Sequence, residues 1–265
     1  MGRPGQHRVG CAMVEDVLLF AAVSFAAQMI DGAIGMAYGL SATNVLLALG
    51  VTPAMASASV HAAEVCTTGA SGLAHWHLGN VQRDLVLRLA LPGMLGGILG
   101  AYVLVGTPVE TVRVFVSAYL LTMGGVILYK ALRPRQPMKL PPWRVAVLGF
   151  CGGTLDAIGG GGWGAVINST LIGQGSVPRM TIGSANLAEF FVTTAVSATF
   201  VATVGLSLWP IIAGLVLGGV LAAPFAALAT RSLPERPLMV IVGVVVFLLA
   251  LRNLLAALRA LTGGG

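Results

Sequence analysis

Long apolar segments separated by short polar ones run along almost the whole chain. Each is about 20 residues or longer, the length at which a helix crosses roughly 30 Å of hydrocarbon. Residues 85–105, 111–132, 208–230 and 236–258 fit single crossings. The pattern predicts an all-α integral membrane protein with about eight transmembrane helical spans.

Two further apolar segments, residues 14–50 and 145–173, are too long for one plain crossing. Each has glycines near its middle, in the sequences DGAIGMAYG and DAIGGGGWG. Glycine weakens a helix and permits backbone conformations that other residues avoid. We therefore expect each segment to be a helix broken at its glycines. A proline and a helix rich in polar residues follow both, at residues 57–74 and 177–203.

These two regions are copies of each other at an offset of 125 residues. Residues 31–64 align without a gap on residues 156–189, and ten of the 34 pairs are identical. We interpret residues 14–132 and 145–258 as two homologous transmembrane repeats. Residues 133–144 form a linker with four cations and four prolines. Paired membrane repeats with interrupted helices are typical of transporters.

The relative orientation of the repeats stays open on the sequence alone. If every segment crosses once, the cations near the segment ends gather on one side and the repeats are parallel. If each broken segment enters and leaves on one side, each repeat crosses an odd number of times and the repeats are inverted. The charge distribution favours the first arrangement, and the habit of transporters favours the second.

Composition excludes several classes of protein. With 57% hydrophobic and 9% charged residues, the chain is not a soluble domain. The net charge of +6 comes from cations at the ends of apolar segments, which is a topology pattern rather than a nucleic-acid-binding face. The three cysteines lack metal-ligand spacing. We expect no metal, no cofactor and no nucleic-acid partner.

The first 14 residues look like a poorly ordered basic tail. The apolar run at residues 17–27 resembles a signal peptide. The matching segment of the second repeat, residues 145–153, is internal, so we expect the first segment to be retained.

The repeated motifs resemble the TauE/SafE family of membrane permeases, also called the sulfite exporter family. They comprise the D-[GA]-x-x-G segments, the G-[VS]-x-P turns at Gly50 and Gly175, and the helix sequences SVHAAE and SANLAE. The resemblance covers residues 14–258. It implies export of a small anion such as sulfite, sulfoacetate or a related sulfonate, by a multi-pass protein of the bacterial inner membrane.

The broken segments are candidates for an anion site. A helix N-terminus presents unpaired N–H groups and the positive end of a dipole, and glycine lets a ligand approach closely. The alternative is that these glycines only allow tight helix crossings, with the two aspartates as N-caps. The residues with a helix-break or capping role are Asp31, Gly35, Gly39, Asp156, Gly160 and Gly164.

Neutral polar side chains near the breaks are candidate ligands for the anion. Any one serine is more simply explained by a hydrogen bond to its own helix. His75 and His77 flank Trp76 and are expected at the membrane interface. The predicted substrate-binding residues are Ser57, Ser59, His61, Asn44, Ser184, Asn186 and Asn168, with Tyr38 and Trp163 as cavity walls.

Glu64 and Glu189 lie inside apolar helices, where a carboxylate is costly and usually functional. We predict that one or both couple proton movement to anion movement; the alternative is a structural bond to a neighbouring helix. Apart from Arg179 at a helix start, no Lys or Arg lies deep in a predicted span. A second interpretation is therefore a cation- or proton-translocating protein that uses these two glutamates.

An enzyme is disfavoured, because the pair of His61 and Glu64 is not repeated. The second copy has Asn186 where the first has histidine. The glycines at 159–162 also lack the Gly-Lys-Ser/Thr of a phosphate-binding loop. The predicted partners are the lipid bilayer, a small anionic substrate and protons.

Overall fold

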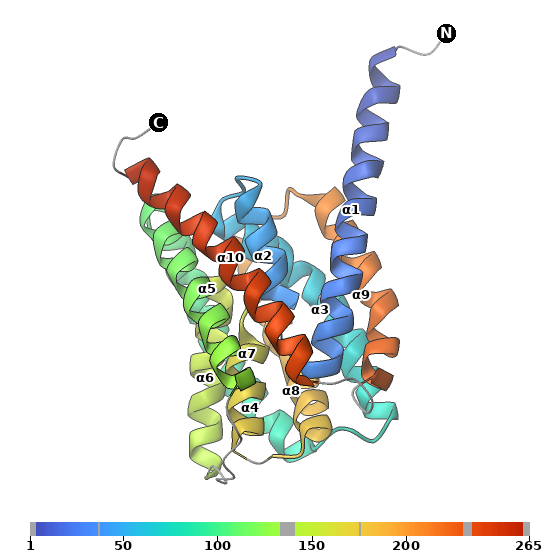
Figure 1. The fold of residues 1–265 in the computed structure, drawn as a ribbon, viewed down its shortest axis with the longest axis vertical. Coiled ribbons are helices and arrows are strands. Elements are labelled where there is room, and N and C mark those ends of the chain that lie inside the picture. The colour runs from blue at the N-terminus through green and yellow to red at the C-terminus, as the bar shows by residue number, and fades with distance from the viewer. Residues whose placement is uncertain (1–3, 37, 133–140, 175, 230–234, 262–265) are drawn as a thin grey trace.

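The computed structural model describes residues 4–36, 38–132, 141–174, 176–229 and 235–261. Within these residues the chain is helical with short turns and no strand, which confirms the all-α prediction. In chain order the helices are α1 (Pro4–Ile34), α2 (Tyr38–Ala48), α3 (Pro53–His77), α4 (Arg83–Gly106), α5 (Val109–Leu132), α6 (Pro142–Gly159), α7 (Trp163–Gly173), α8 (Pro178–Thr203), α9 (Trp209–Ala229) and α10 (Glu235–Leu261) (Figure 1).

Six of the described helices are long and apolar enough to cross a membrane. They are α4, α5, α8 and α9, together with α1 over Val17–Ile34 and α10 over Met239–Ala260. Helix α3 has 25 residues but carries many buried polar side chains, and it packs inside the molecule against α8 and α9. The total of about eight spans stays a prediction.

Many large apolar side chains are exposed on the outside of the described helices, whereas many polar ones are buried inside. Leu95 on α4 and Leu221 on α9 are 65% and 62% exposed, whereas His61 on α3 and Asp156 on α6 are fully buried. In lipid, exposed leucine is favourable, and a polar group needs a partner inside the protein. This distribution is that of a multi-pass membrane protein.

Two segment boundaries differ from expectation. The basic tail expected through residue 14 is helical from Pro4 onward as part of α1, because extending an existing helix adds a hydrogen bond for each residue fixed. Of the predicted linker, residues 133–140 lie outside the described residues, and Pro142 already begins α6. Residues 263–265, predicted as a tail, also lie outside the described residues.

Both long segments are broken at glycine, as predicted. The first breaks between α1 and α2 at Gly35, where φ is +72°. The second breaks between α6 and α7 at Gly160, Gly161 and Gly162, with φ values of +68°, +141° and +132°. These are conformations that glycine adopts readily and side-chain-bearing residues avoid. Gly35 and Gly160 are equivalent positions of the two repeats.

The first helix of each repeat packs against a helix of the other repeat. Helix α1 packs along α9, and its equivalent α6 packs along α4. Glycines permit both contacts: Gly214 lies against the carbonyl of Val17, and Gly149 lies against the carbonyl of Leu89. Small residues at such crossings let helix backbones approach closely in lipid. The two repeats are thus interlocked rather than side by side.

The repeats are inverted relative to each other. Equivalent helices α3 and α8 pack against each other and run antiparallel, since Gly72 faces Leu187 while Gly69 faces Phe190. Helices α5 and α10 are also equivalent, and they too pack antiparallel. Parallel repeats would have placed both pairs in the same direction. This settles the question that the charge distribution left open, in favour of the inverted arrangement.

Candidate functional site

The site lies where the two broken segments cross. Gly39, in the first turn of α2, touches the break of the other repeat: a Cβ on Gly39 would lie 2.7 Å from the Cα of Gly161. A Cβ on Gly164, in the first turn of α7, would overlap the carbonyl of Gly35. Glycine is therefore needed at both crossings for steric reasons, which was the alternative to a ligand-binding role.

Two equivalent side chains tie the breaks together. The Thr43 hydroxyl donates to the carbonyl oxygen of Gly160. The Asn168 side-chain amide, 125 residues later in the chain, donates to the carbonyl oxygen of Gly35. A helix break frees carbonyl groups that must find partners away from water. Each repeat thus satisfies a freed carbonyl of the other.

The two aspartates bridge their own breaks. An oxygen of Asp31 accepts a hydrogen bond from the backbone N–H of Tyr38 at 3.4 Å. Equivalently, an oxygen of Asp156 accepts one from the N–H of Trp163 at 2.8 Å. Tyr38 and Trp163 are the first residues of α2 and α7, so both carboxylates lie at helix N-termini. The capping role stays a prediction, and these bonds support it.

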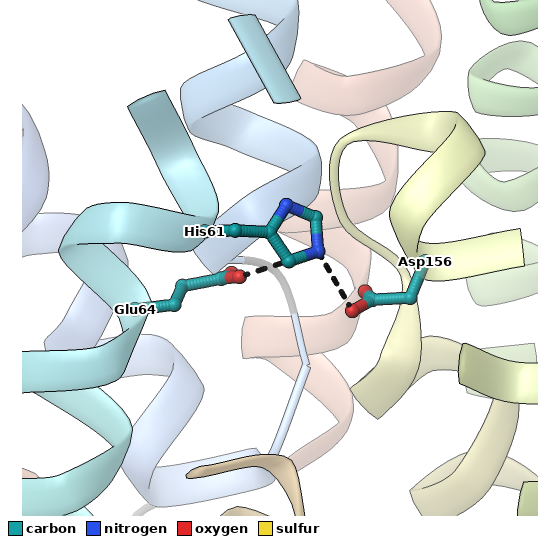
Figure 2. Close-up of side chains that lie close together, drawn as sticks. All are labelled: His61, Glu64 and Asp156. Carbon is teal, nitrogen blue, oxygen red and sulfur yellow. Dashed lines mark hydrogen bonds and ion pairs between the residues drawn. The ribbon is translucent and has the colours of Figure 1, made fainter. Parts of the chain in front are cut away.

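His61 joins the two repeats at the centre of the crossing. Figure 2 shows its ring between the carboxylates of Asp156 and Glu64. The distance from Nε2 is 3.1 Å to Oδ2 of Asp156 and 4.0 Å to Oε2 of Glu64. All three side chains are at most 2% exposed. The sequence predicted His61 and Glu64 on one face of a helix, but it did not predict Asp156 as their partner.

The hydrogen bonds around His61 fix its orientation. Its Nδ1–H donates to the backbone carbonyl of Ser57 at 2.8 Å, because a carbonyl can only accept. The Ser57 hydroxyl donates to the carbonyl of Ala157 in α6 at 2.7 Å, which adds a second link between the repeats. Nε2 is therefore the ring nitrogen directed at the two carboxylates.

These contacts resemble a Ser–His–Asp triad but do not have its chemistry. Ser57 Oγ lies 3.2 Å from His61 Nδ1. A nucleophilic serine must give its proton to the histidine. Here Nδ1 already carries a proton for the Ser57 carbonyl, and the hydroxyl points to Ala157. The arrangement holds helices together rather than activating a nucleophile.

Glu64 has an unusual environment. Its Oε2 is buried and has no hydrogen-bond partner among the described residues. Its Oε1 lies against α2, where a Cβ on Gly39 would be 2.6 Å away. The first turn of a helix offers N–H groups without partners inside the helix. One oxygen of Glu64 thus faces a helix N-terminus and the other faces His61.

Four buried acids lie near the crossing, and His61, which contacts two of them, carries a positive charge only when it is protonated. Asp31, Glu64, Asp156 and Glu189 are each at most 7% exposed, and Glu189 interacts electrostatically with the other three. No Lys or Arg is buried in the described part of the chain, and Arg179 is exposed. An anion entering this site would meet four carboxyl groups unless they carry protons or are matched by another cation.

Two of the three serines predicted as ligands, Ser59 and Ser184, bond their own helices. Ser59 Oγ donates to the Met55 carbonyl at 2.8 Å, and Ser184 Oγ donates to the Met180 carbonyl at 2.6 Å. Ser184 also accepts a bond from the backbone N–H of Gln82 at 2.8 Å. Their roles in substrate binding stay predictions. The bonds observed are those of the alternative explanation, in which each serine bonds its own helix.

The two predicted wall residues are anchors between helices. The Tyr38 hydroxyl lies 3.0 Å from Ser24 Oγ and donates to the Leu215 carbonyl at 3.1 Å. The indole N–H of Trp163 donates to the Ala185 carbonyl at 3.1 Å. Both side chains are at most 2% exposed. Both lie next to the breaks, as the first residues of α2 and α7, and their role as cavity walls stays a prediction.

The remaining predicted asparagines, Asn44 and Asn186, form hydrogen bonds with residues other than His61. Asn44 accepts from the side-chain amide of Asn253 in α10 at 3.1 Å and donates to its own helix at Leu40. Asn186, the equivalent of His61, donates to Ser71 Oγ at 2.9 Å. Its Oδ1 has no hydrogen-bond partner in the described structure. The two repeats therefore differ at this position: the first has a histidine that contacts two carboxylates, and the second has an asparagine that bonds a serine.

His75 was expected at the membrane interface, but it is fully buried. Its Nε2–H donates to the carbonyl of Gly32 in α1 at 3.2 Å, and its Nδ1 accepts from Asn80 at 3.3 Å. The neighbouring Trp76 is exposed and stacks with Arg83, and its position at the membrane interface stays a prediction. Helical periodicity could have separated them, because adjacent residues face about 100° apart.

Comparison with known proteins gives one consistent result. The family model "Sulfite exporter TauE/SafE" matches residues 20–253. The chain is 37% identical over 251 residues to "Probable membrane transporter protein YtnM" of Bacillus subtilis (strain 168), covering 91% of this chain and 84% of that protein. No solved structure matches it. On the extent of both matches, together with the doubled broken helices, this chain belongs to the TauE/SafE family and is a membrane permease of that type.

Proposed function

We propose that the protein exports a small sulfur oxyanion, such as sulfite or sulfoacetate, by alternating access. The observation that carries this proposal is the crossing of two broken helices from inverted repeats, lined by buried polar side chains. Inverted repeats can rock against each other around a fixed central site. The family description supplies the substrate class. The permease has no enzymatic role in this proposal.

The N-terminus of α2 is the proposed anion subsite. Glu64 Oε1 lies against this turn, and Asp31 accepts the N–H of Tyr38. A carboxylate at a helix N-terminus occupies the position that a substrate oxyanion would take. When Glu64 is protonated it loses its negative charge, and with it the favourable interaction with the α2 N-terminus. A substrate oxyanion can then take its place there. Proton and anion movement are coupled in this way.

Glu189 is proposed to hold a second coupling proton. It is the equivalent of Glu64 and interacts with the same acids. Protonation of both glutamates removes two of the four negative charges that an anion meets. In this proposal, neutral side chains donate hydrogen bonds to the anion along the rest of its path as the repeats move. They are Ser57, Ser59, His61, Ser184, Asn186, Asn44 and Asn168.

The substrate is tested by thermal unfolding of the purified protein in detergent with sulfite, sulfoacetate, taurine, thiosulfate and sulfate. A ligand at 100 times its Kd stabilises the folded state by about 2.7 kcal/mol. We expect one sulfur oxyanion to raise the Tm selectively. Equal responses to every anion, or none, would contradict the substrate assignment.

Coupling is tested separately in liposomes. Glu64→Gln together with Glu189→Gln should remove the pH dependence of anion flux, because glutamine resembles the protonated acid at every pH. Glu110→Gln is the matched control, since Glu110 is exposed at the start of α5. Full pH dependence in the double variant would refute coupling through these residues.

A second candidate function is translocation of a cation or of protons alone. It is favoured by the four buried acids and the lack of buried Lys or Arg in the described residues. Cation-dependent flux in liposomes without any sulfur oxyanion would support this function over the first.

A further inference from the structure

We infer that His61, Glu64 and Asp156 form a binding site for one divalent first-row transition-metal ion. The ligand atoms are Nε2 of His61, Oε2 of Glu64 and Oδ2 of Asp156. This inference goes beyond the proposed function, and it concerns a ligand other than the anion.

The spacing of the three atoms suits such an ion. Nε2 of His61 lies 3.1 Å from the Asp156 oxygen and 4.0 Å from the Glu64 oxygen, and all three residues offer ligand atoms within 4.8 Å of one another. Two ligands about 2.1 Å from a tetrahedral metal lie roughly 3.4 Å apart. Movements of an ångström or less in the side chains would bring the donors to this geometry.

Hydrogen bonds to neighbouring backbone groups orient two of the three proposed ligands, His61 and Asp156. The Nδ1–H of His61 is held by the Ser57 carbonyl at 2.8 Å, which directs Nε2 toward the carboxylates. Asp156 uses Oδ1 to accept the Trp163 N–H, which leaves Oδ2 for the site. Metal-bound histidines generally donate their other N–H to a carbonyl or carboxylate in this manner, and ligating carboxylates are likewise fixed.

The third ligand atom, Oε2 of Glu64, has no other partner in the described structure. Glu64 Oε2 is buried without a hydrogen-bond partner among the described residues, and Figure 2 shows its carboxylate directed at His61. An unpaired buried carboxylate oxygen is costly. A proton on Nε2 of His61 pairs with Asp156 Oδ2 at 3.1 Å but leaves Glu64 Oε2 at 4.0 Å, beyond hydrogen-bond distance. Without that proton, all three groups present only acceptors to this point. A cation between the three groups resolves their mutual repulsion.

A divalent metal can neutralise the cluster with a single ion. Neutral His61 with two carboxylates has a charge of −2, which one divalent ion or two protons reduce to zero. A neutral cluster is the least costly in a low-dielectric interior. No Lys or Arg is buried in the described chain to provide the missing charge.

The donor set limits the kind of metal. One imidazole and two carboxylates suit Zn²⁺, Co²⁺, Fe²⁺ or Mn²⁺, whereas Ca²⁺ and Mg²⁺ prefer oxygen alone. Three protein ligands leave a coordination position open, as in zinc sites that bind water or substrate. The second repeat has Asn186 in place of histidine, so we expect one metal per chain.

The metal and one of the two proposed coupling protons share a donor, Glu64. Metal binding requires deprotonated carboxylates and neutral imidazole, so affinity should fall as the pH falls. Binding of metal does not require the anion, and the two ideas can fail independently. If the protein binds an oxyanion but no metal, the proposed function stands and this inference is wrong.

The test uses the full-length, untagged protein in detergent, stripped with chelator and titrated with Co²⁺ and then Zn²⁺. We expect one Co²⁺ per chain, with visible d–d absorption that Zn²⁺ abolishes. His61→Asn should lower affinity at least about 10-fold. This substitution places in the first repeat the residue that the second already carries. His77→Asn is the control, because His77 is exposed on the same helix.

Glu64→Gln provides a second variant of nearly unchanged shape and should also weaken Co²⁺ binding. Size-exclusion chromatography identifies any variant that does not fold. Absence of one tight site in the wild-type protein, or equal affinity in His61→Asn and His77→Asn, would overturn the inference.

Discussion

Gly39 provides the sharpest test of how the broken helices cross. A Cβ at this position would lie 2.7 Å from the Cα of Gly161 and 2.6 Å from Oε1 of Glu64. Ordinary van der Waals contact begins near 3.4 Å, so Gly39→Ala must push the break of the other repeat away by about 0.7 Å. The Gly161 neighbour is backbone, which cannot swing aside as a side chain can.

The expected effect is a net loss of stability. Overpacking of this kind costs typically 1–3 kcal/mol, whereas alanine favours a helix over glycine by up to about 1 kcal/mol. The net loss is then up to about 2 kcal/mol, which lowers the Tm by up to roughly 4–8 °C for a chain of this size. The added methyl also displaces Glu64 from α2, so the anion-induced rise in Tm should shrink.

The matched control is Gly125→Ala in α5. Gly125 is helical, and a Cβ there would meet nothing within 4 Å. This variant should keep the wild-type Tm or raise it slightly. Both variants are compared by thermal unfolding in the same detergent. Equal melting temperatures for Gly39→Ala and Gly125→Ala would refute the close crossing of the two breaks.

Three further substitutions have defined outcomes in the same unfolding assay. Ser57→Ala leaves the Ala157 carbonyl without its donor and should cost about 1–2 kcal/mol. Its control, Ser59→Ala, removes only a bond within α3 and should change the stability by no more than about 0.5 kcal/mol. A larger loss in Ser59→Ala than in Ser57→Ala would contradict the link between the repeats. Tyr38→Phe removes the bond to the Leu215 carbonyl and should cost about 1 kcal/mol, and a neutral result would mean that this hydroxyl is dispensable. His75→Phe leaves the Gly32 carbonyl and Asn80 without this partner and should cost about 1–3 kcal/mol, and an unchanged Tm would contradict these two buried bonds.

Much of the architecture was predictable because it depends on local patterns. Apolar length predicts helices in lipid, and the glycines at 35 and 160 predict the breaks. The repeat at an offset of 125 predicts two related halves, and the structure places Thr43 and Asn168 in equivalent bonds. The family assignment from these motifs is also confirmed.

Other features depend on contacts that no local pattern contains. His61 and Asp156 are 95 residues apart and belong to different repeats. No short sequence motif could therefore have predicted their contact. Periodicity placed Glu64 near His61 on one helix, but the missing partner of its Oε2 is visible only when the surrounding helices are present. The same holds for His75, whose burial depends on α1 packing beside it.

The sequence by itself determined a helical membrane permease of two repeats, because helix length, glycine breaks and internal similarity are properties of the chain. Only the tertiary structure decided that the repeats are inverted, since charge counts were compatible with both orientations and the antiparallel packing of α3 on α8 was not encoded in either helix alone. It also decided that one histidine and two carboxylates share a buried point. Proximity across a crossing is set by the packing of several helices together, and that packing is a property of the whole fold.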